Sequence, residues 1–270
     1  MTAKRIALYG KGGIGKTTLS VNLALTMARE GRKVLLVGCD PKADTARLLV
    51  KKPPEALVER YDDVIAGRAS ADQLIVEARD NLWCCESGGP RPGAGCAGRG
   101  ILIALELLKK AGVLDRMDVV LFDVLGDVVC GGFATPVTKG YADRVYVVTS
   151  GEQASLLAAN NILRGMAAIG GQIGGLIFNA RGFTSEDRLV SAFAQACHVP
   201  VAGSLPYDER IKLEELRRRA ICDAPSDTPV QEAMLALAHA LLSDAPPAQA
   251  QPFEPEALYQ WIERMGRDDA

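Results

Sequence analysis

Short apolar runs alternate with longer amphipathic segments along most of this chain. Runs of about five apolar residues predict buried strands, and segments with apolar positions three or four apart predict helices. Because the two kinds alternate, the pattern predicts an α/β fold with a doubly wound, mainly parallel sheet. The predicted strands are 5–9, 33–38, 119–123, 144–149, 174–178 and 199–203, and the predicted helices are 17–29, 101–110, 153–168, 185–196, 209–219, 228–243 and 254–265.

Two stretches lack this pattern. Residues 51–80 are polar and irregular, and we expect two or three short helices there. Residues 84–100 contain six glycines and two prolines, which predict a long loop in front of the helix at 101–110.

The last part of the chain differs in composition. We expect residues 1–243 to form one domain and residues 244–270 to form a linker followed by a short amphipathic helix. Leu258, Trp261, Ile262 and Met265 share one face of that helix, which should pack on the domain or on a dimer mate. Its other face is acidic, which argues against a membrane-targeting tip.

A phosphate-binding motif lies between the first predicted strand and the first predicted helix. The glycines let the backbone curl around phosphate oxygens, and the following helix presents its unpaired N–H groups and positive dipole end. Lys16 should reach the β- and γ-phosphates, and the Thr17 hydroxyl should hold Mg²⁺. The motif predicts ATP or GTP binding, and its residues are Gly10, Lys11, Gly12, Gly13, Ile14, Gly15, Lys16, Thr17 and Thr18.

Lys11 is a second lysine within this motif. The run Lys-Gly-Gly-Ile-Gly-Lys-Thr resembles the deviant Walker A loop of the dimeric P-loop ATPases that include the MinD, ParA and nitrogenase iron protein families. In that group the extra lysine reaches the partner's nucleotide, so the resemblance implies a homodimer that encloses two ATP molecules.

Acidic residues follow two of the predicted strands that come after this loop in the sequence. Asp40 and Asp44 follow the strand at 33–38, and Asp123 ends the apolar strand at 119–123 like a Walker B aspartate. Ligands of open α/β sheets lie at such strand ends, so Asp40 and Asp44 are candidates for Mg²⁺-water contacts and for sensing the γ-phosphate. Helix capping by Asp44 is the alternative interpretation.

Composition narrows the function further. The net charge is −2 and the pI is about 5.8, without a basic stripe, so we expect no nucleic-acid partner. The chain lacks a secretory segment and any apolar run of the ~18 residues that a membrane span needs. We therefore expect a cytoplasmic protein without a membrane partner. Structural disulfides are rare in cytoplasmic proteins, so we do not expect the seven cysteines to form them.

Two of these cysteines stand alone in glycine-rich surroundings. Cys96 precedes the helix at 101–110, and Cys130 precedes a Gly-Gly pair. Either one by itself could be a small buried residue, and zinc would need further ligands. In a symmetric dimer, two cysteines from each subunit supply four thiolates for one cluster on the two-fold axis.

The motifs at 10–17, 38–44, 86–100 and 123–133 resemble the nitrogenase iron protein family, ATP-driven [4Fe-4S] reductases that serve nitrogenase and nitrogenase-like enzymes. The resemblance implies ATP, Mg²⁺ and one [4Fe-4S] cluster per dimer, held by Cys96 and Cys130. It places Asp40 in switch I, Asp123 at the start of switch II, and Asp127 as the base for the attacking water. Arg99 matches a partner-docking arginine that some members carry ADP-ribosylated. The implied nucleotide-binding residues beyond the loop are Asp40, Lys42, Asp44, Asn179, Pro206, Asp208 and Glu215.

Other functions for this phosphate loop fit less well. A ParA/MinD-type positioning ATPase would need a basic DNA-binding surface or a basic amphipathic terminus, and it gives Cys96 and Cys130 no role. An iron–sulfur scaffold ATPase would normally have a C-x-x-C pair.

The resemblance implies a catalytic partner and an upstream ferredoxin or flavodoxin. Lys212 stands where dinitrogen-reducing members usually have glutamine, and the stretch before Cys84 diverges from them. We therefore expect a nitrogenase-like partner that reduces small organosulfur compounds such as methylthio-alkanes. A nitrogenase iron protein for dinitrogen reduction is the alternative.

Overall fold

The computed structural model describes residues 3–70, 73–89, 97–124, 134–225 and 228–268. Its centre is an eight-stranded sheet in the order β3-β4-β2-β5-β1-β6-β7-β8, in which only the β3–β4 pair is antiparallel. This confirms the predicted doubly wound, mainly parallel α/β fold. The strands are β1 (Lys4–Gly10), β2 (Val34–Gly38), β3 (Val76–Arg79), β4 (Leu82–Glu86), β5 (Val119–Asp123), β6 (Arg144–Thr149), β7 (Ile173–Asn179) and β8 (Val201–Leu205).

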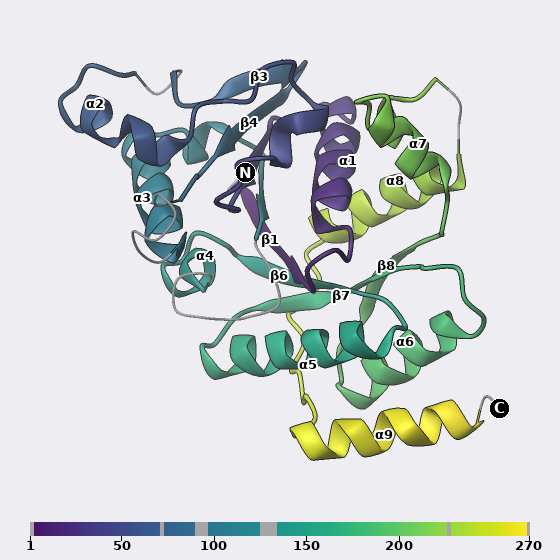
Figure 1. The fold of residues 1–270 in the computed structure, drawn as a ribbon. Helices are drawn as coiled ribbons and strands as arrows, with labels where there is room; N and C mark the ends of the chain where they lie inside the picture. Colours follow the sequence, from purple (N-terminus) through teal and green to yellow (C-terminus); the bar gives the residue numbers. More distant parts are fainter. Residues whose placement is uncertain (1–2, 71–72, 90–96, 125–133, 226–227, 269–270) are drawn as a thin grey trace.

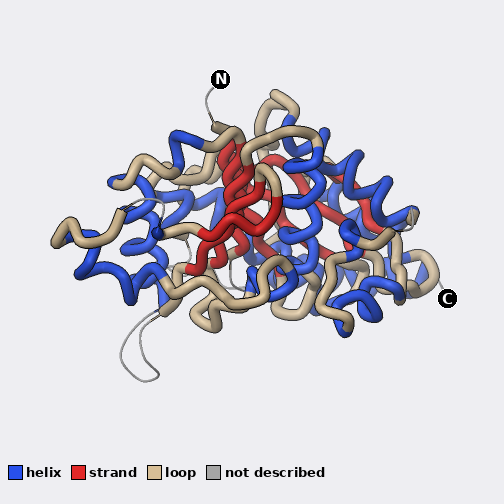
Figure 2. The backbone as a smooth tube through the Cα atoms, turned by 90° about the horizontal axis from the view of Figure 1, so that it is seen from above, coloured by secondary structure: helices blue, strands red, loops and turns tan. Residues whose placement is uncertain are grey.

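Helices cover both faces of the sheet (Figures 1 and 2). Alternate residues of β1 enter separate cores: Ile6 and Leu8 pack with α1 and α8, whereas Ala7 and Tyr9 pack with α3 and α5. Since both faces are covered, the central strands β2 and β5 are buried at every residue. The helices are α1 (Lys16–Arg29), α2 (Tyr61–Ile65), α3 (Ala97–Lys110), α4 (Thr135–Thr138), α5 (Gln153–Ala168), α6 (Glu186–Ala196), α7 (Arg210–Leu216), α8 (Pro229–Leu242) and α9 (Pro255–Asp268), with 3₁₀ turns η1 (Thr45–Leu48), η2 (Leu57–Arg60), η4 (Leu114–Arg116) and η5 (Ile221–Asp223).

Every predicted strand and helix is present, but the prediction was wrong between residues 76 and 100. Residues 76–79 form β3 instead of irregular chain, residues 84–86 belong to β4 instead of a loop, and α3 begins at Ala97, four residues earlier than expected. Strand β4 is short, and parallel pairing with β2 stabilises it. This pairing begins where Leu82 of β4 lies beside Val34 of β2. Such long-range pairing overrides local composition.

The C-terminal helix α9 packs on its own domain. This is one of the two arrangements expected for it, the other being packing on a dimer mate. Leu258 and Trp261 belong to the core below α6, and Ile262 and Met265 pack against it. The Trp261 ring lies 6.1 Å from that of Phe193 and 5.6 Å from that of Phe253. The boundary at residue 243 stays a prediction.

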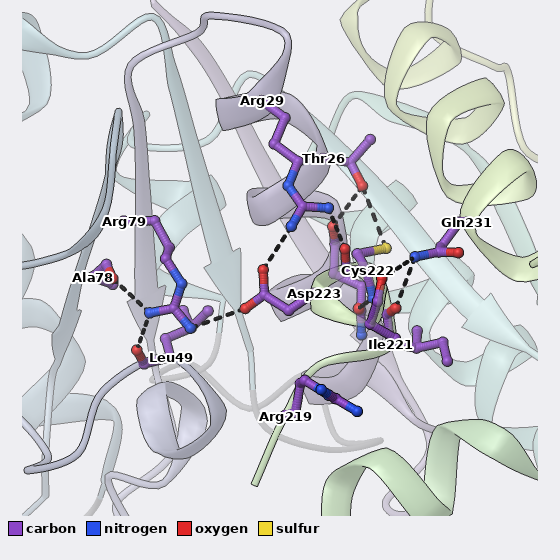
Figure 3. A network of polar contacts seen from close by, with 12 residues as sticks. Thr26, Arg29, Leu49, Ala78, Arg79, Arg219, Ile221, Cys222, Asp223 and Gln231 are labelled. Carbon is purple, nitrogen blue, oxygen red and sulfur yellow. Dashed lines mark hydrogen bonds and ion pairs between the residues drawn. The ribbon is translucent and has the colours of Figure 1, made fainter. Parts of the chain in front are cut away.

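A polar network fastens the end of helix α1 to the sheet edge and to η5 (Figure 3). Asp223 accepts ion pairs from Arg29 at 2.8 Å and from Arg79 at 2.9 Å. The neighbouring amide of Cys222 donates to Asn22 Oδ1 at 2.8 Å. These contacts hold α1 in place at the end opposite the phosphate loop.

Within the described residues, no helix is both long enough and apolar enough to cross a membrane.

Candidate functional site

The phosphate loop connects the end of β1 to the start of α1. Gly13 and Gly15 have φ angles of 76° and 92°, a left-handed conformation that costs energy for residues with a Cβ. At Gly15 a Cβ would also lie 2.7 Å from the Asn179 amide nitrogen. Glycine at these positions lets the loop curl in front of the helix N-terminus, where unpaired N–H groups can bind an anion.

Lys16 lies across this loop. Its side chain is only 8% exposed, and Nζ donates to the carbonyl oxygens of Gly10 at 2.8 Å and Lys11 at 3.0 Å. These two contacts hold the ammonium group inside the curve of the glycine-rich loop. Lys11 contacts the Gly12 carbonyl at 3.4 Å from the exposed side of the loop.

Asp123 is the buried acid below the loop. It is 3% exposed and accepts hydrogen bonds from the hydroxyls of Thr17 at 2.7 Å, Thr45 at 3.1 Å and Ser20 at 3.2 Å. Burial raises the pKa of Asp123, and the Thr17 hydrogen bond partly offsets this effect. A hydroxyl and a carboxylate beside a phosphate site are hard oxygen donors, which fits Mg²⁺ chemistry.

A cavity of about 320 Å³ opens in front of these groups. Asp40 Oδ1 accepts the amide of Lys42 at 2.9 Å, which fixes the start of this segment. Asp44 precedes η1 but makes no side-chain capping bond, and its carboxylate pairs with Arg47 at 3.3 Å, so the capping alternative is not supported. Residues that the sequence analysis selected line the cavity: Gly12, Gly13, Gly15, Lys16, Thr17, Thr18, Asp40, Lys42, Asp44 and Asp123.

A second cavity of about 210 Å³ adjoins the loop and shares Gly13, Gly15 and Thr18 with the first. The Asn179 side chain donates to the Ile14 carbonyl at 2.7 Å, so its amide oxygen is left to accept a hydrogen bond from a ligand. Thr18 donates to Glu215. The lining includes the four residues selected for the base and ribose, namely Asn179, Pro206, Asp208 and Glu215.

The lining of this second cavity includes Lys212, which was already singled out from the sequence, and also Tyr207 and Arg181, which were not predicted there. Lys212 lies 5.5 Å from the centre of the Tyr207 ring, a cation–π contact. Arg181 donates to the Gly13 carbonyl at 2.7 Å. Asp208 is bound by Arg210, which lowers the pKa of Asp208.

Glu86 is a further buried acid beside the site. It is 0% exposed, and its Oε1 accepts the backbone N–H of Ala46 at 2.7 Å. Burial raises the pKa of Glu86 to about 7, the Ala46 amide lowers it in part, and the nearby Asp123 carboxylate raises it further. The sequence analysis gave Glu86 no role of its own, because it assigned the end of β4 to a loop.

Glu86→Gln should stabilise the protein most at high pH. Between the ordinary carboxyl pKa of 4.5 and about 7, the unfolded chain loses this proton while the folded chain keeps it, so stability falls as pH rises. Glutamine removes that cost, which is at most about 3 kcal/mol above pH 7 and near zero below pH 4.5. Urea unfolding at pH 5 and pH 8 measures it, with the exposed Glu77→Gln as control. An equal gain at both pH values would contradict this prediction.

Cys96, Cys130 and Asp127 lie outside the described residues. Arg99 is exposed in the first turn of α3. The described part of the chain contains no group of three or more histidine, cysteine or acidic residues that could hold a metal ion. Its five cysteines are free and buried: Cys39, Cys84, Cys85, Cys197 and Cys222.

Comparison with known proteins gives a consistent result. Residues 4–267 match the family described as 4Fe-4S iron sulfur cluster binding proteins, NifH/frxC family. The chain is 45% identical over 224 residues to nitrogenase iron protein 2 of Methanobacterium ivanovii, covering 82% of this chain and 83% of that protein. It is 36% identical over 268 residues to the nitrogenase iron protein of Methanococcus voltae, covering 97% and 96%.

Solved structures with a similar fold include cell-division ATPases. The MinD structure from Pyrococcus furiosus has a TM-score of 0.70 at 22% identity, covering 88% of this chain and 98% of that one. MinD from Aquifex aeolicus has the same TM-score and identity, covering 91% and 99%. At this identity the likeness concerns the fold alone, a P-loop ATPase sheet.

Proposed function

Because the chain belongs to the NifH/frxC family of 4Fe-4S iron sulfur cluster binding proteins, we propose that it is an ATP-hydrolysing, homodimeric electron donor. The observation that carries the proposal is the pocket in which Lys16, Thr17 and Asp123 converge beside a glycine-rich loop. This arrangement supports phosphoryl transfer from a Mg²⁺-nucleotide, in which positioning and charge supply most of the catalysis. A ParA/MinD-type positioning function has no support beyond the fold.

Each residue of the first cavity has a role in this proposal. Lys16 exchanges its carbonyl partners for the β- and γ-phosphate oxygens, and Thr17 holds Mg²⁺ with Asp123 behind it. Asp40, Lys42 and Asp44 also line this cavity and would contact the γ-phosphate. Lys11 lies half-buried at the loop, from where it can reach the nucleotide of a partner subunit.

The second cavity holds the base and ribose. Asn179 offers its amide oxygen to the amino group of adenine, while one N–H of the same amide donates to the Ile14 carbonyl. Pro206, Asp208 and Glu215 complete the lining, and Glu215 is held by Thr18. These contacts favour ATP over GTP, because guanine has a carbonyl oxygen where adenine has this amino group.

Cys96 and Cys130 are proposed as the ligands of one [4Fe-4S] cluster shared by two subunits. The cluster supplies one-electron transfer at low potential. Asp127, four residues after Asp123, is proposed as the base that orients the attacking water, and exposed Arg99 as a residue of the partner-docking face. The proposal includes residues 1–243 as the ATPase and iron–sulfur domain, and a cytoplasmic location.

The catalytic partner is proposed to be a nitrogenase-like component, with a ferredoxin or flavodoxin as the upstream donor. The names of the relatives, nitrogenase iron proteins, favour dinitrogen as the final substrate. Small organosulfur compounds such as methylthio-alkanes are the other candidate, favoured by Lys212 in the base pocket.

The test is anaerobic purification followed by two measurements. The protein should contain about four iron atoms per dimer and show a cluster absorbance band that bleaches on reduction. With its co-purified partner, it should transfer electrons only when Mg²⁺ and ATP are present. Dinitrogen and a methylthio-alkane are then offered to the complex in parallel. A colourless protein with ATPase activity would refute the electron-donor function.

A further inference from the structure

The loop after β4 packs directly on the segment that lines the phosphate cavity. Gly89 lies so close to Pro41 that a Cβ at Gly89 would be 2.7 Å from the proline Cβ and 3.3 Å from its Cα. Pro41 stands between Asp40 and Lys42, two residues of the cavity wall. A shift of the 40–44 segment therefore cannot occur without moving Gly89 or opening a gap at this contact.

Glu86 makes a second connection between the same two segments. Its Oε1 holds the amide of Ala46 in η1, and the preceding hydroxyl of Thr45 donates to Asp123. Its other oxygen, Oε2, is buried without a hydrogen-bond partner among the described residues. This oxygen occupies the space where a Cβ of Gly38 would be, so the carboxylate is wedged between β2 and η1.

A partly satisfied buried carboxylate is unfavourable for stability. Among the described contacts, the Glu86 carboxylate offsets this unfavourable burial by binding the η1 segment to the end of β4. We therefore interpret Glu86 as a residue that positions η1 through the Ala46 amide, and not as one that only fills space in the core.

The same loop reaches helix α3. A Cβ at Gly100 would lie 2.9 Å from the Gly88 carbonyl oxygen and 3.2 Å from Gly89 Cα, so the first turn of α3 rests on this loop. The carbonyl of Ser87 also accepts the amide of Val58 in η2 at 3.2 Å. Close backbone contacts thus continue from the cavity wall through residues 86–89 to α3, which carries the exposed Arg99.

We propose that Glu86 and Gly89 form a mechanical link that transmits movement of the 40–48 segment to the first turn of α3. Glu86 is a positioning residue that acts through the Ala46 amide, and Gly89 acts through Pro41. This inference rests on the proposed function, because it assumes that ATP occupies the cavity.

Hydrogen exchange measures the link without requiring a partner protein. The purified protein is exchanged with and without Mg²⁺ and a non-hydrolysable ATP analogue. In the parent chain the analogue should slow exchange both at residues 40–48 and at residues 97–104. Gly89→Ala forces Pro41 to shift, and Glu86→Met removes the acceptor for Ala46 while keeping the side-chain size.

Both variants should still gain protection from the analogue at 40–45, although Glu86→Met frees the Ala46 amide itself. Both should reduce the protection at 97–104 by about fivefold or more, the lower range of coupling between sites. Glu86→Gln keeps an acceptor oxygen and should behave like the parent. Gly266→Ala is the glycine control, since a Cβ there meets nothing within 4 Å.

Two failures can be told apart. If the analogue binds and protects 40–48, but protection at 97–104 is the same in the parent, Gly89→Ala and Glu86→Met, the link is wrong and the ATP site stands. If the parent does not bind the analogue, the proposed function is wrong and the link falls with it.

Discussion

Lys16→Gln is expected to abolish ATP-driven electron transfer while the iron content stays unchanged. The ammonium group is almost buried and already points at the phosphate position from its two carbonyl partners. Glutamine at this position lacks the positive charge that would neutralise the β- and γ-phosphates. Removing one such preorganised charge-stabilising group typically lowers kcat by about 10²–10³-fold.

The measurement is anaerobic ATPase activity together with the cluster absorbance of the same sample. The exposed Lys51→Gln provides the matched control, because it makes the same change of charge away from the cavity. An Lys16→Gln protein that hydrolyses ATP at the parent rate would show that the phosphate loop has been misinterpreted.

Cys96→Ser and Cys130→Ser should each eliminate the cluster. In a dimer with four thiolate ligands, one substitution removes two of them, because both subunits carry the change. Iron should fall from about four atoms per dimer to near zero, and the cluster absorbance band should disappear.

Cys197→Ala is the appropriate comparison for these two variants. Cys197 is a free and buried cysteine at the end of α6, where it has no proposed part in the cluster. It should lose some stability and keep its iron. If Cys96→Ser or Cys130→Ser retains one cluster per dimer, the ligand assignment is wrong.

Local sequence signals determined most of the fold and the phosphate loop. Strands were visible as short apolar runs, and helices were visible as apolar residues three or four positions apart, so both could be recognised without tertiary contacts. All six predicted strands are present. The loop from Gly10 to Thr18 was recognisable because its glycines and Lys16 act within one short segment. Asp123 was found for the same reason, as an acid at the end of an apolar strand.

The secondary structure described between residues 76 and 100 was decided only by tertiary contacts. The same is true of which residues distant in sequence lie together at the site. Strand β4 depends on pairing with β2, and β3 depends on pairing with β4. The position of Glu86 against Ala46 depends on the pairing of β4 with β2. Composition cannot reveal such contacts, because their energy comes from residues 40 positions apart in the chain. Asn179 likewise approaches Ile14 only when the sheet brings β7 beside the phosphate loop. Motifs within one segment are fixed by local chemistry, whereas these groups are placed by the packing of the whole sheet.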